Sequence, residues 1–207
     1  CDPELWETGS SNKIVLGIDF GRTQDPTVCW ALEETNDVWW TREIWRERGM
    51  TTPDQQRHLR RRIRHADRVC LDYTGPGIGL GDLLVEEFGE WAPERHEFGK
   101  VELCTFTVGL KRQIFPKMRR AFEAPTKVRV PISSDVREDL HEMRQIIRNG
   151  EYTYSAPRTA DGHSDRCTGL ALAWRATGSV GEKVIHISDV TMSGNARSKF
   201  KNSRMVC

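Results

Sequence analysis

The sequence predicts an α/β domain in which an antiparallel three-strand meander shares a mixed sheet with parallel strands, and helices cover both faces. Two observations carry this prediction. Three short apolar runs joined by short connections come first, at 13–46, and helical and strand-like spacings of apolar residues then alternate. The composition agrees, because 37% hydrophobic and 29% charged residues are typical of a globular domain.

The meander consists of three expected strands, at residues 13–20, 27–33 and 38–46. The runs are short and rich in β-branched and aromatic residues, which pack well on a pleated surface. A Thr-Asn-Asp turn at 35–37 separates the second run from the third, and Asn and Asp are favoured in tight turns. Such short connections pair neighbouring strands antiparallel.

Helical and strand-like patterns alternate in the middle of the chain. A glycine-rich turn at 74–81 interrupts them, and Thr52 and Pro53 suit the N-cap and first position of the first helix. Strands separated by helices run parallel, because the crossover returns the chain in the same direction. The expected helices span residues 53–66, 82–88 and 110–122, and the expected strands 68–72 and 101–107.

The last third of the chain is predicted to be mainly helical. Its expected elements are a short strand at 128–131, a helix at 134–148, a strand at 151–155 and a helix at 163–177. Residues 1–12 have the composition of a linker, and residues 179–207 are a polar, basic tail with a weak strand pattern at 183–187. The folded domain is therefore expected to span 13–178.

Charge, hydropathy and cysteine spacing narrow the function classes. A net charge of +1 gives no bulk argument for nucleic acid, so a DNA-binding face would need to concentrate its basic residues. No run approaches the roughly 20 apolar residues of a membrane span, and no secretion leader is evident.

None of the six cysteines forms a C-x-x-C pair, which gives a zinc site little support. Cys29, Cys70 and Cys104 lie in strand-like runs and are interpreted as buried thiols in a reducing compartment.

Three acids fall at the ends of expected elements. Asp19 ends the first strand, Asp72 ends the first strand after a helix, and Asp165 lies in the first turn of the last helix. The carboxyl ends of parallel strands meet at one edge of a sheet, where ligands usually bind. Clustered carboxylates take up protons or bind a cation, and their hard oxygens suit Mg²⁺ or Mn²⁺. The alternative is that each acid is only a turn residue or helix cap.

The residues around these acids resemble the nuclease domain of the large terminase subunit of tailed bacteriophages. Residues 17–27 (GIDFGRTQDPT) resemble its first motif, residues 71–77 (LDYTGPG) its second, and residues 163–165 (HSD) running into 169–173 (GLALA) its third. The stretch 111–131 also fits the family's layout, and the resemblance spans about residues 13–178.

This resemblance implies a ribonuclease-H-like fold and cleavage of double-stranded DNA by two metal ions during viral genome packaging in the host cytoplasm. Asp19, Asp72 and Asp165 would hold the ions, with Asp25 as a fourth acid acting directly or through water. The alternative for Asp25 is a cap before Pro26. No Walker A pattern occurs. In intact terminases an ATPase motor precedes this domain, so the resemblance implies that this chain is the nuclease part alone, with that motor, portal and small terminase as further partners.

Three further residues are candidates for substrate contacts. Lys111 and Arg112 open an expected basic helix and are candidates to neutralise DNA phosphates, with Lys111 preferred near the scissile phosphate. His163 is a candidate to assist the metal site or contact a phosphate, or else to be a cap or surface residue. The arginine cluster at 57–64 has the same two interpretations, phosphate contact or solvated helix face.

Three other functions stay open on the sequence alone. Residues 17–23 (GIDFGRT) also resemble the first phosphate loop of actin- and sugar-kinase-like ATPases, although the chain is short for two lobes and lacks a second glycine-rich loop. A branched-DNA resolvase or transposase would share the same fold. A non-catalytic docking module would use the acids as caps.

Overall fold

A computed structural model describes residues 12–21, 25–123, 125–157 and 164–178. Its centre is a six-stranded mixed sheet with the order β7-β4-β1-β2-β3-β8. β1 pairs antiparallel with β2 and β2 with β3, whereas β4 runs parallel to β1, β7 to β4, and β8 to β3. The predicted fold class is thus confirmed. The strands are β1 (Ile14–Asp19), β2 (Thr27–Thr35), β3 (Val38–Glu47), β4 (Arg68–Asp72), β7 (Val101–Cys104) and β8 (Val128–Arg129).

The β2–β3 connection is a two-residue turn. Asn36 and Asp37 both have positive φ, 53° and 59°, and Thr35 pairs with Val38 across the turn. Two consecutive left-handed residues match the right-handed twist of the flanking strands. The expected turn at 35–37 is confirmed, with its tip at the Asn-Asp pair.

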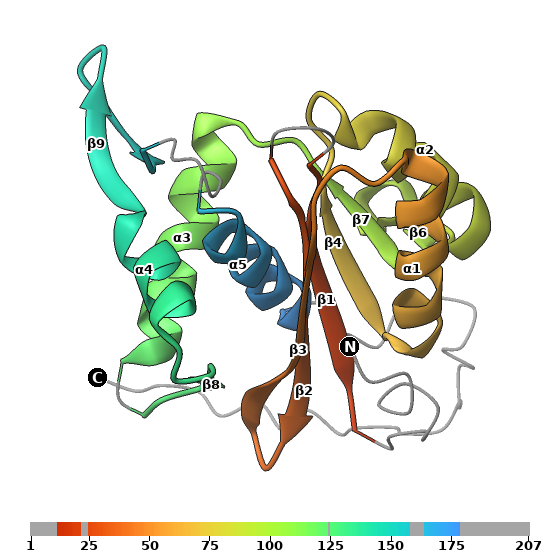
Figure 1. Cartoon of the computed structure of the whole chain (residues 1–207), viewed down its shortest axis with the longest axis horizontal. Coiled ribbons are helices and arrows are strands. Elements are labelled where there is room, and N and C mark those ends of the chain that lie inside the picture. Colours follow the sequence, from red (N-terminus) through yellow and green to blue (C-terminus); the bar gives the residue numbers. More distant parts are fainter. Residues whose placement is uncertain (1–11, 22–24, 124, 158–163, 179–207) are drawn as a thin grey trace, which may run out of the picture.

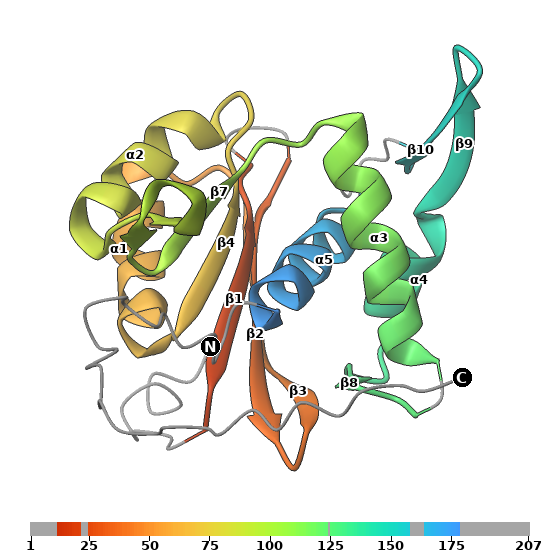
Figure 2. The same ribbon diagram turned by 180° about the vertical axis from the view of Figure 1, so that it is seen from behind.

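Helices cover both faces of the sheet (Figures 1 and 2). On one face α1 (Thr52–His65) and α2 (Gly77–Phe88) bury Leu59, Ile63, Leu80 and Leu84 against the sheet. On the other face α5 (Asp165–Thr177) lies directly on β1 and β2, and α3 (Val108–Phe122) packs against α5. Each face therefore has its own hydrophobic core.

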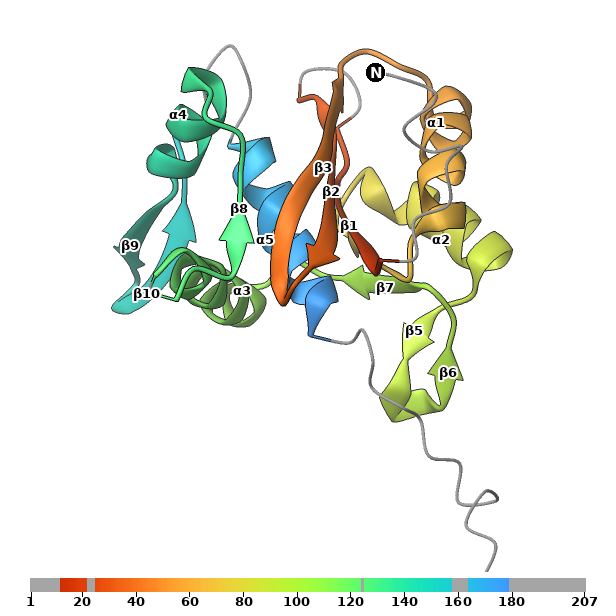
Figure 3. The same ribbon diagram turned by 90° about the horizontal axis from the view of Figure 1, so that it is seen from below.

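Three helix starts differ from the prediction, and one of them is that of α3, which begins at Val108 instead of residue 110. The N-cap of α1 is Thr51 instead of Thr52, because the Thr51 side chain accepts a hydrogen bond from the Asp54 amide at 3.4 Å. α2 begins at Gly77, within the expected glycine-rich turn. Past α2, a small ribbon of β5 (Trp91–Ala92) and β6 (Glu97–Phe98) lies beside β7 (Figure 3), and the sequence pattern gave no sign of it.

The predicted helix at 134–148 is wrong in its second half. The helix α4 (Ser134–Glu142) is followed by β9 (Arg144–Arg148), which pairs antiparallel with β10 (Glu151–Ser155). Asn149 and Gly150 form the turn, with positive φ of 52° and 78°, and an Asn-Gly pair is a strong hairpin signal. The predicted strand at 151–155 is confirmed. The hairpin stands away from the sheet (Figures 1 and 2), and Ile147 on it is 77% exposed.

The buried cysteines agree with the prediction, whereas both chain ends lie outside the described residues. Cys29, Cys70 and Cys104 are buried and free, as predicted, and so is Cys167. The expected linker at 1–12 (except Asn12), the tail at 179–207 and its weak strand lie outside the described residues, as does the predicted helix start at His163. None of the helices in the described part of the chain is long and apolar enough to cross a membrane.

Candidate functional site

Four of the predicted acids line one cleft of about 530 Å³. Asp19 and Asp72 come from the carboxyl ends of β1 and β4, Asp165 from the first turn of α5, and Asp25 from the segment before β2. Lys111 of α3 lines the same cleft. The structure therefore brings together five side chains from four separate parts of the sequence.

Strand register explains why Asp19 and Asp72 meet. β1 and β4 are parallel neighbours, and Ile18 pairs with Leu71, which places the two following acids side by side at the end of the sheet. Asp19 and Asp72 are the last residues of their strands, and both line the cleft at this end of the sheet.

A contact between two main chains brings Asp165 to the same place. A Cβ atom on Gly17 would lie 2.0 Å from the carbonyl oxygen of Gly169 and 2.1 Å from the amide nitrogen of Ala173. The backbone of α5 thus lies directly against the backbone of β1, an approach that only glycine allows. The first turn of this closely packed helix then lies at the same end of the sheet as Asp19.

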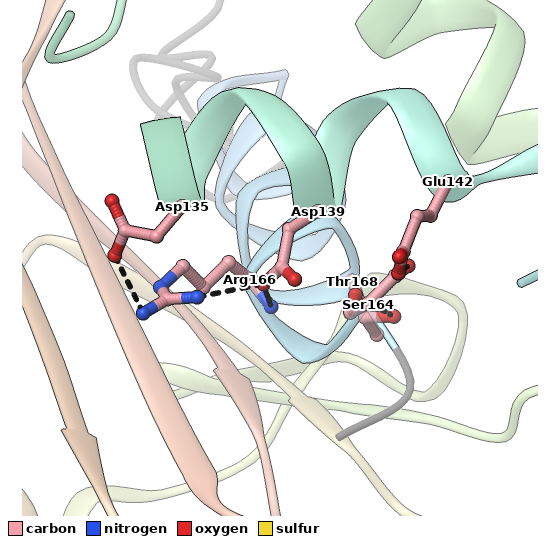
Figure 4. A network of polar contacts seen from close by, with 6 residues as sticks. All are labelled: Asp135, Asp139, Glu142, Ser164, Arg166 and Thr168. Atoms are coloured by element: carbon pink, nitrogen blue, oxygen red, sulfur yellow. Dashed lines mark hydrogen bonds and ion pairs between the residues drawn. The ribbon is translucent and has the colours of Figure 1, made fainter. Parts of the chain in front are cut away.

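A polar network fixes the start of α5 (Figure 4). The Arg166 guanidinium binds Asp135 at 2.7 Å and Asp139 at 3.2 Å, both on α4, and the Ser164 hydroxyl donates to Glu142 at 3.4 Å. Ser164 has a left-handed backbone, with φ of 58°, immediately before Asp165. These positioning residues were not predicted, because the helical spacing of the acids on α4 indicates neither which residue they bind nor where it lies.

Burial and crowding act on the acids of the cleft. The pKa of Asp19 is raised well above its usual value, first by burial and then by the negative charges of Asp165, Asp72 and Asp25, while a hydrogen bond from Thr168 opposes the rise. The pKa of Asp72 is also raised by burial, against a hydrogen bond from Thr74 and the positive charge of Lys111. Carboxylates that resist ionisation in this way gain most from a bound cation.

The donor set fits a hard divalent cation. Asp72 Oδ1 is buried and has no hydrogen-bond partner among the described residues, which is costly unless a ligand completes it. All four acids offer oxygen ligands, the kind that Mg²⁺ and Mn²⁺ prefer. Within the described residues, the one group of three metal-binding side chains with ligand atoms all within 4.8 Å of one another is elsewhere, at Cys70, Glu102 and Cys104. No three described acids of the cleft meet that spacing.

The candidate substrate residues fall in different places. Arg112 does not line the acid cleft but holds the β9–β10 hairpin. Its Nε donates to the Tyr152 carbonyl oxygen at 2.6 Å, its Nη2 lies 3.0 Å from Glu151, and its guanidinium lies 4.5 Å from the centre of the Tyr152 ring. His163 lies outside the described residues.

The arginine cluster at 57–64 lies on α1, and three of its members are paired with acids. Arg57 binds Asp54, Arg60 binds Glu87, and the buried Arg62 binds Glu43. These contacts favour the interpretation of a structural helix face for this part of the cluster.

The hairpin also contributes a wall of the cleft that the sequence did not suggest. Met143, Tyr154, Ser155 and Ala156 line it from the α4–β10 segment, and the Tyr154 ring packs 5.4 Å from that of Phe115. The Asn-Gly turn in the sequence could have predicted this hairpin. It could not have predicted that the hairpin lies beside the acids.

Comparison with known families decides the relationship. The family model described as "Terminase RNaseH-like domain" matches residues 16–174. The chain belongs to the terminase RNase H-like domain family. The match covers every motif with an acid of the cleft, from β1 through α5.

Solved structures of terminase nucleases share the fold. The large terminase nuclease of thermophilic phage G20c with bound magnesium has a TM-score of 0.63 and 21% identity, covering 80% of this chain and 82% of that one. The nuclease domain of Thermus phage P74-26 has a TM-score of 0.59 and 21% identity, with 79% and 78% covered. A longer large terminase from another thermophilic bacteriophage, in complex with ATP-γ-S, has a TM-score of 0.54 and 12% identity, covering 79% of this chain but 40% of that one. No curated protein matches the chain.

Proposed function

We propose that this terminase domain is a metal-dependent endonuclease that cleaves double-stranded DNA during viral genome packaging. The observation that carries the proposal is the convergence of Asp19, Asp25, Asp72 and Asp165 in one cleft, where Asp72 Oδ1 is buried without a partner among the described residues. Hydrolysis of a phosphodiester requires stabilisation of developing negative charge, and an acid-rich cleft can supply it only through bound cations.

The proposed ligands are Asp19, Asp72 and Asp165, with Asp25 as a fourth acid that acts directly or through water. Two Mg²⁺ or Mn²⁺ ions, when bound, would supply an activated water and stabilise the leaving 3′ oxygen. The large terminase nuclease of phage G20c, which has the same fold, was solved with bound magnesium, with cobalt and with zinc, which supports a divalent-metal site. Ion binding would also relieve the repulsion that raises the pKa of Asp19.

The chain's own side chains would hold the substrate. Lys111 lines the cleft together with the acids and is the proposed contact for the scissile phosphate, because its ammonium group is the basic group that lowers the pKa of Asp72. Arg112 is proposed to act indirectly. It binds the β9–β10 hairpin, which forms a wall of the cleft, and so keeps that wall in place. His163 stays a candidate phosphate or metal-site contact.

The partners follow from the family. We propose that residues 13–178 are the nuclease unit, with residues 1–12 as a linker and 179–207 as a tail. The longer phage terminase that was solved with ATP-γ-S supports an ATPase domain as the neighbour of this unit. Portal and small terminase are the further proposed partners, and the host cytoplasm is the proposed site of action.

The test is cleavage of plasmid DNA at low salt with Mn²⁺ or Mg²⁺. We expect nicking and linearisation that EDTA stops, and a loss of at least about 100-fold in Asp72→Asn, since the remaining acids would bind the ions poorly. Asp37→Asn is the matched control, because Asp37 lies in the exposed β2–β3 turn, where Asn also adopts positive φ. Full cutting by a folded Asp72→Asn chain would refute the site.

Two further arms address the alternatives. Linear and branched DNA are compared, and a strong preference for junctions would favour a resolvase. ATP is supplied without DNA, and hydrolysis abolished by Asp19→Asn would favour a kinase-like lobe.

A further inference from the structure

A second group of metal-ligand side chains lies outside the acid cleft, on the same sheet. The ligand atoms of Cys70, Glu102 and Cys104 all lie within 4.8 Å of one another. β4 and β7 are parallel, with Cys70 opposite Glu102 and Asp72 opposite Cys104, so the three side chains occupy neighbouring positions on one face. Both thiols are buried, with 1% and 3% of their surface exposed.

The two oxygens of Glu102 have different partners. Oε1 accepts both Arg175 contacts, from Nε at 2.8 Å and Nη2 at 2.5 Å. Oε2 faces the thiols and accepts from Cys70 Sγ at 3.2 Å. A carboxylate that ligates a metal ion is commonly held by a second hydrogen-bonded group, and Arg175 occupies that place here. Arg175 thus orients Glu102 without covering the oxygen that points at the cysteines.

Charge balance permits an ion in this buried place. The charge of Glu102 is already compensated by Arg175. A divalent cation that binds both sulfurs as thiolates releases two protons to solvent, so the net charge of the group does not change. The usual penalty for burying a charge is therefore avoided.

We propose that Cys70, Cys104 and Glu102 form a binding site for a thiophilic divalent metal ion such as Zn²⁺. Soft sulfur ligands select zinc over magnesium, and two thiolates with one carboxylate leave a fourth tetrahedral position for water. A cavity of about 540 Å³ reaches the group from the side of Glu102 and Arg175, whereas neither cysteine lines it. The bound ion would tie β4 to β7 directly, and through Arg175 to α5.

The ligand atoms of the group distinguish it chemically from the acid cleft, although Cys104 lies opposite Asp72 across the β4–β7 pair. The cleft offers oxygen ligands, whereas this group offers two sulfurs, so one spectroscopic signal separates the two sites. Co²⁺ bound by thiolates absorbs in the near ultraviolet through sulfur-to-metal charge transfer, and Co²⁺ bound by carboxylates does not.

The test titrates the whole chain with Co²⁺ and then displaces it with Zn²⁺, in a background where Cys1 and Cys207 are replaced by Ser. We expect a charge-transfer band that saturates at one ion per chain, that Zn²⁺ abolishes, and that persists in Asp72→Asn. Cys70→Ser and Cys104→Ser should each remove most of the band. Cys29→Ser and Cys167→Ser are the matched controls, since both are buried free cysteines outside the group.

Two further measurements complete the test, and the second of them needs no substitution in the group itself. Glu102→Gln preserves the shape of the side chain but removes an anionic ligand, and we expect it to weaken Zn²⁺ binding by at least about 10-fold, the lower end of the cost of losing a group that only supports a ligand. X-ray absorption at the zinc edge of the zinc-loaded background chain should count two sulfur ligands. A spectrum with nitrogen and oxygen ligands alone, or a cobalt band that survives the loss of both Cys70 and Cys104, would overturn the proposal.

Discussion

Asp19 is the acid of the cleft that feels the negative charge of all three others, and burial already opposes its ionisation. Its pKa is therefore higher in the folded chain than in the unfolded chain. Between these two values the folded state binds more protons, so the free energy of unfolding falls as the pH rises through that window. Without metal, the site costs stability at neutral pH.

We therefore expect Asp19→Asn to raise the melting temperature of the domain in EDTA at neutral pH. Each kcal/mol of relieved repulsion corresponds to about 2–4 °C for a chain of this size. The gain should vanish at acid pH, below the usual pKa of an aspartate, where the Asp19 carboxyl is protonated in both states. Scanning calorimetry at both pH values measures the effect, with Asp37→Asn as control. Equal melting temperatures at neutral pH would contradict this account of Asp19.

At the scale of elements, the contact between β1 and α5 decides whether the site exists. It is made by backbone atoms at Gly17 and Gly169, so neither element can withdraw to make room for a side chain without moving Asp19 from Asp165. The network at Arg166 then joins the start of α5 to α4, whose chain continues into the hairpin wall.

A pair of glycine substitutions tests this contact. Gly17→Ala should cost more than the roughly 1–3 kcal/mol usual for overpacking, because the new methyl group would meet rigid backbone. Gly79→Ala in α2 is the control, since its Cβ meets nothing within 4 Å and the change should stabilise the helix by about 0.5–1 kcal/mol. Urea unfolding gives both values. A Gly17→Ala chain of unchanged stability would show that β1 and α5 are not packed this closely.

Elements also show where prediction from sequence stops. The meander was predictable because the Asn36–Asp37 turn and the apolar runs are local signals, and the acids at strand ends followed from them. The β9–β10 hairpin was missed because Ile146 and Ile147 continued the apolar spacing of α4, although the Asn149–Gly150 turn contradicted a helix. The Arg166 network and the Cys70–Glu102–Cys104 group depend on tertiary contact or strand register, which no local pattern encodes.

At the scale of the whole molecule, the proposed function has an almost neutral chain acting on a polyanion. The net charge is +1, so long-range attraction to DNA would be weak, and the proposed binding would depend on local cations such as Lys111. The neighbouring domain and the packaging partners proposed above would then contribute most of the affinity for DNA.

The salt dependence of the affinity for DNA measures how many phosphate contacts the domain makes. We expect the affinity of the domain for linear DNA to fall by less than the roughly 10³–10⁵-fold that 6–10 phosphate contacts produce between 50 and 200 mM salt. Lys111→Gln should make the dependence shallower, whereas Lys117→Gln on the same helix, outside the cleft, should leave it nearly unchanged. Fluorescence anisotropy with a labelled duplex gives the slope. A steep slope in the wild-type chain would indicate a larger basic surface than Lys111 represents.

The glycine contact between β1 and α5 also bears on how such domains diverge. Because main-chain atoms set the distance between β1 and α5, substitutions of core residues such as Ile18 or Leu170 should change the stability of the domain before they change the positions of Asp19 and Asp165. The distance between the two acids therefore depends little on the size of the surrounding side chains. Core substitutions that keep Gly17 and Gly169 should therefore leave the positions of these two carboxylates unchanged.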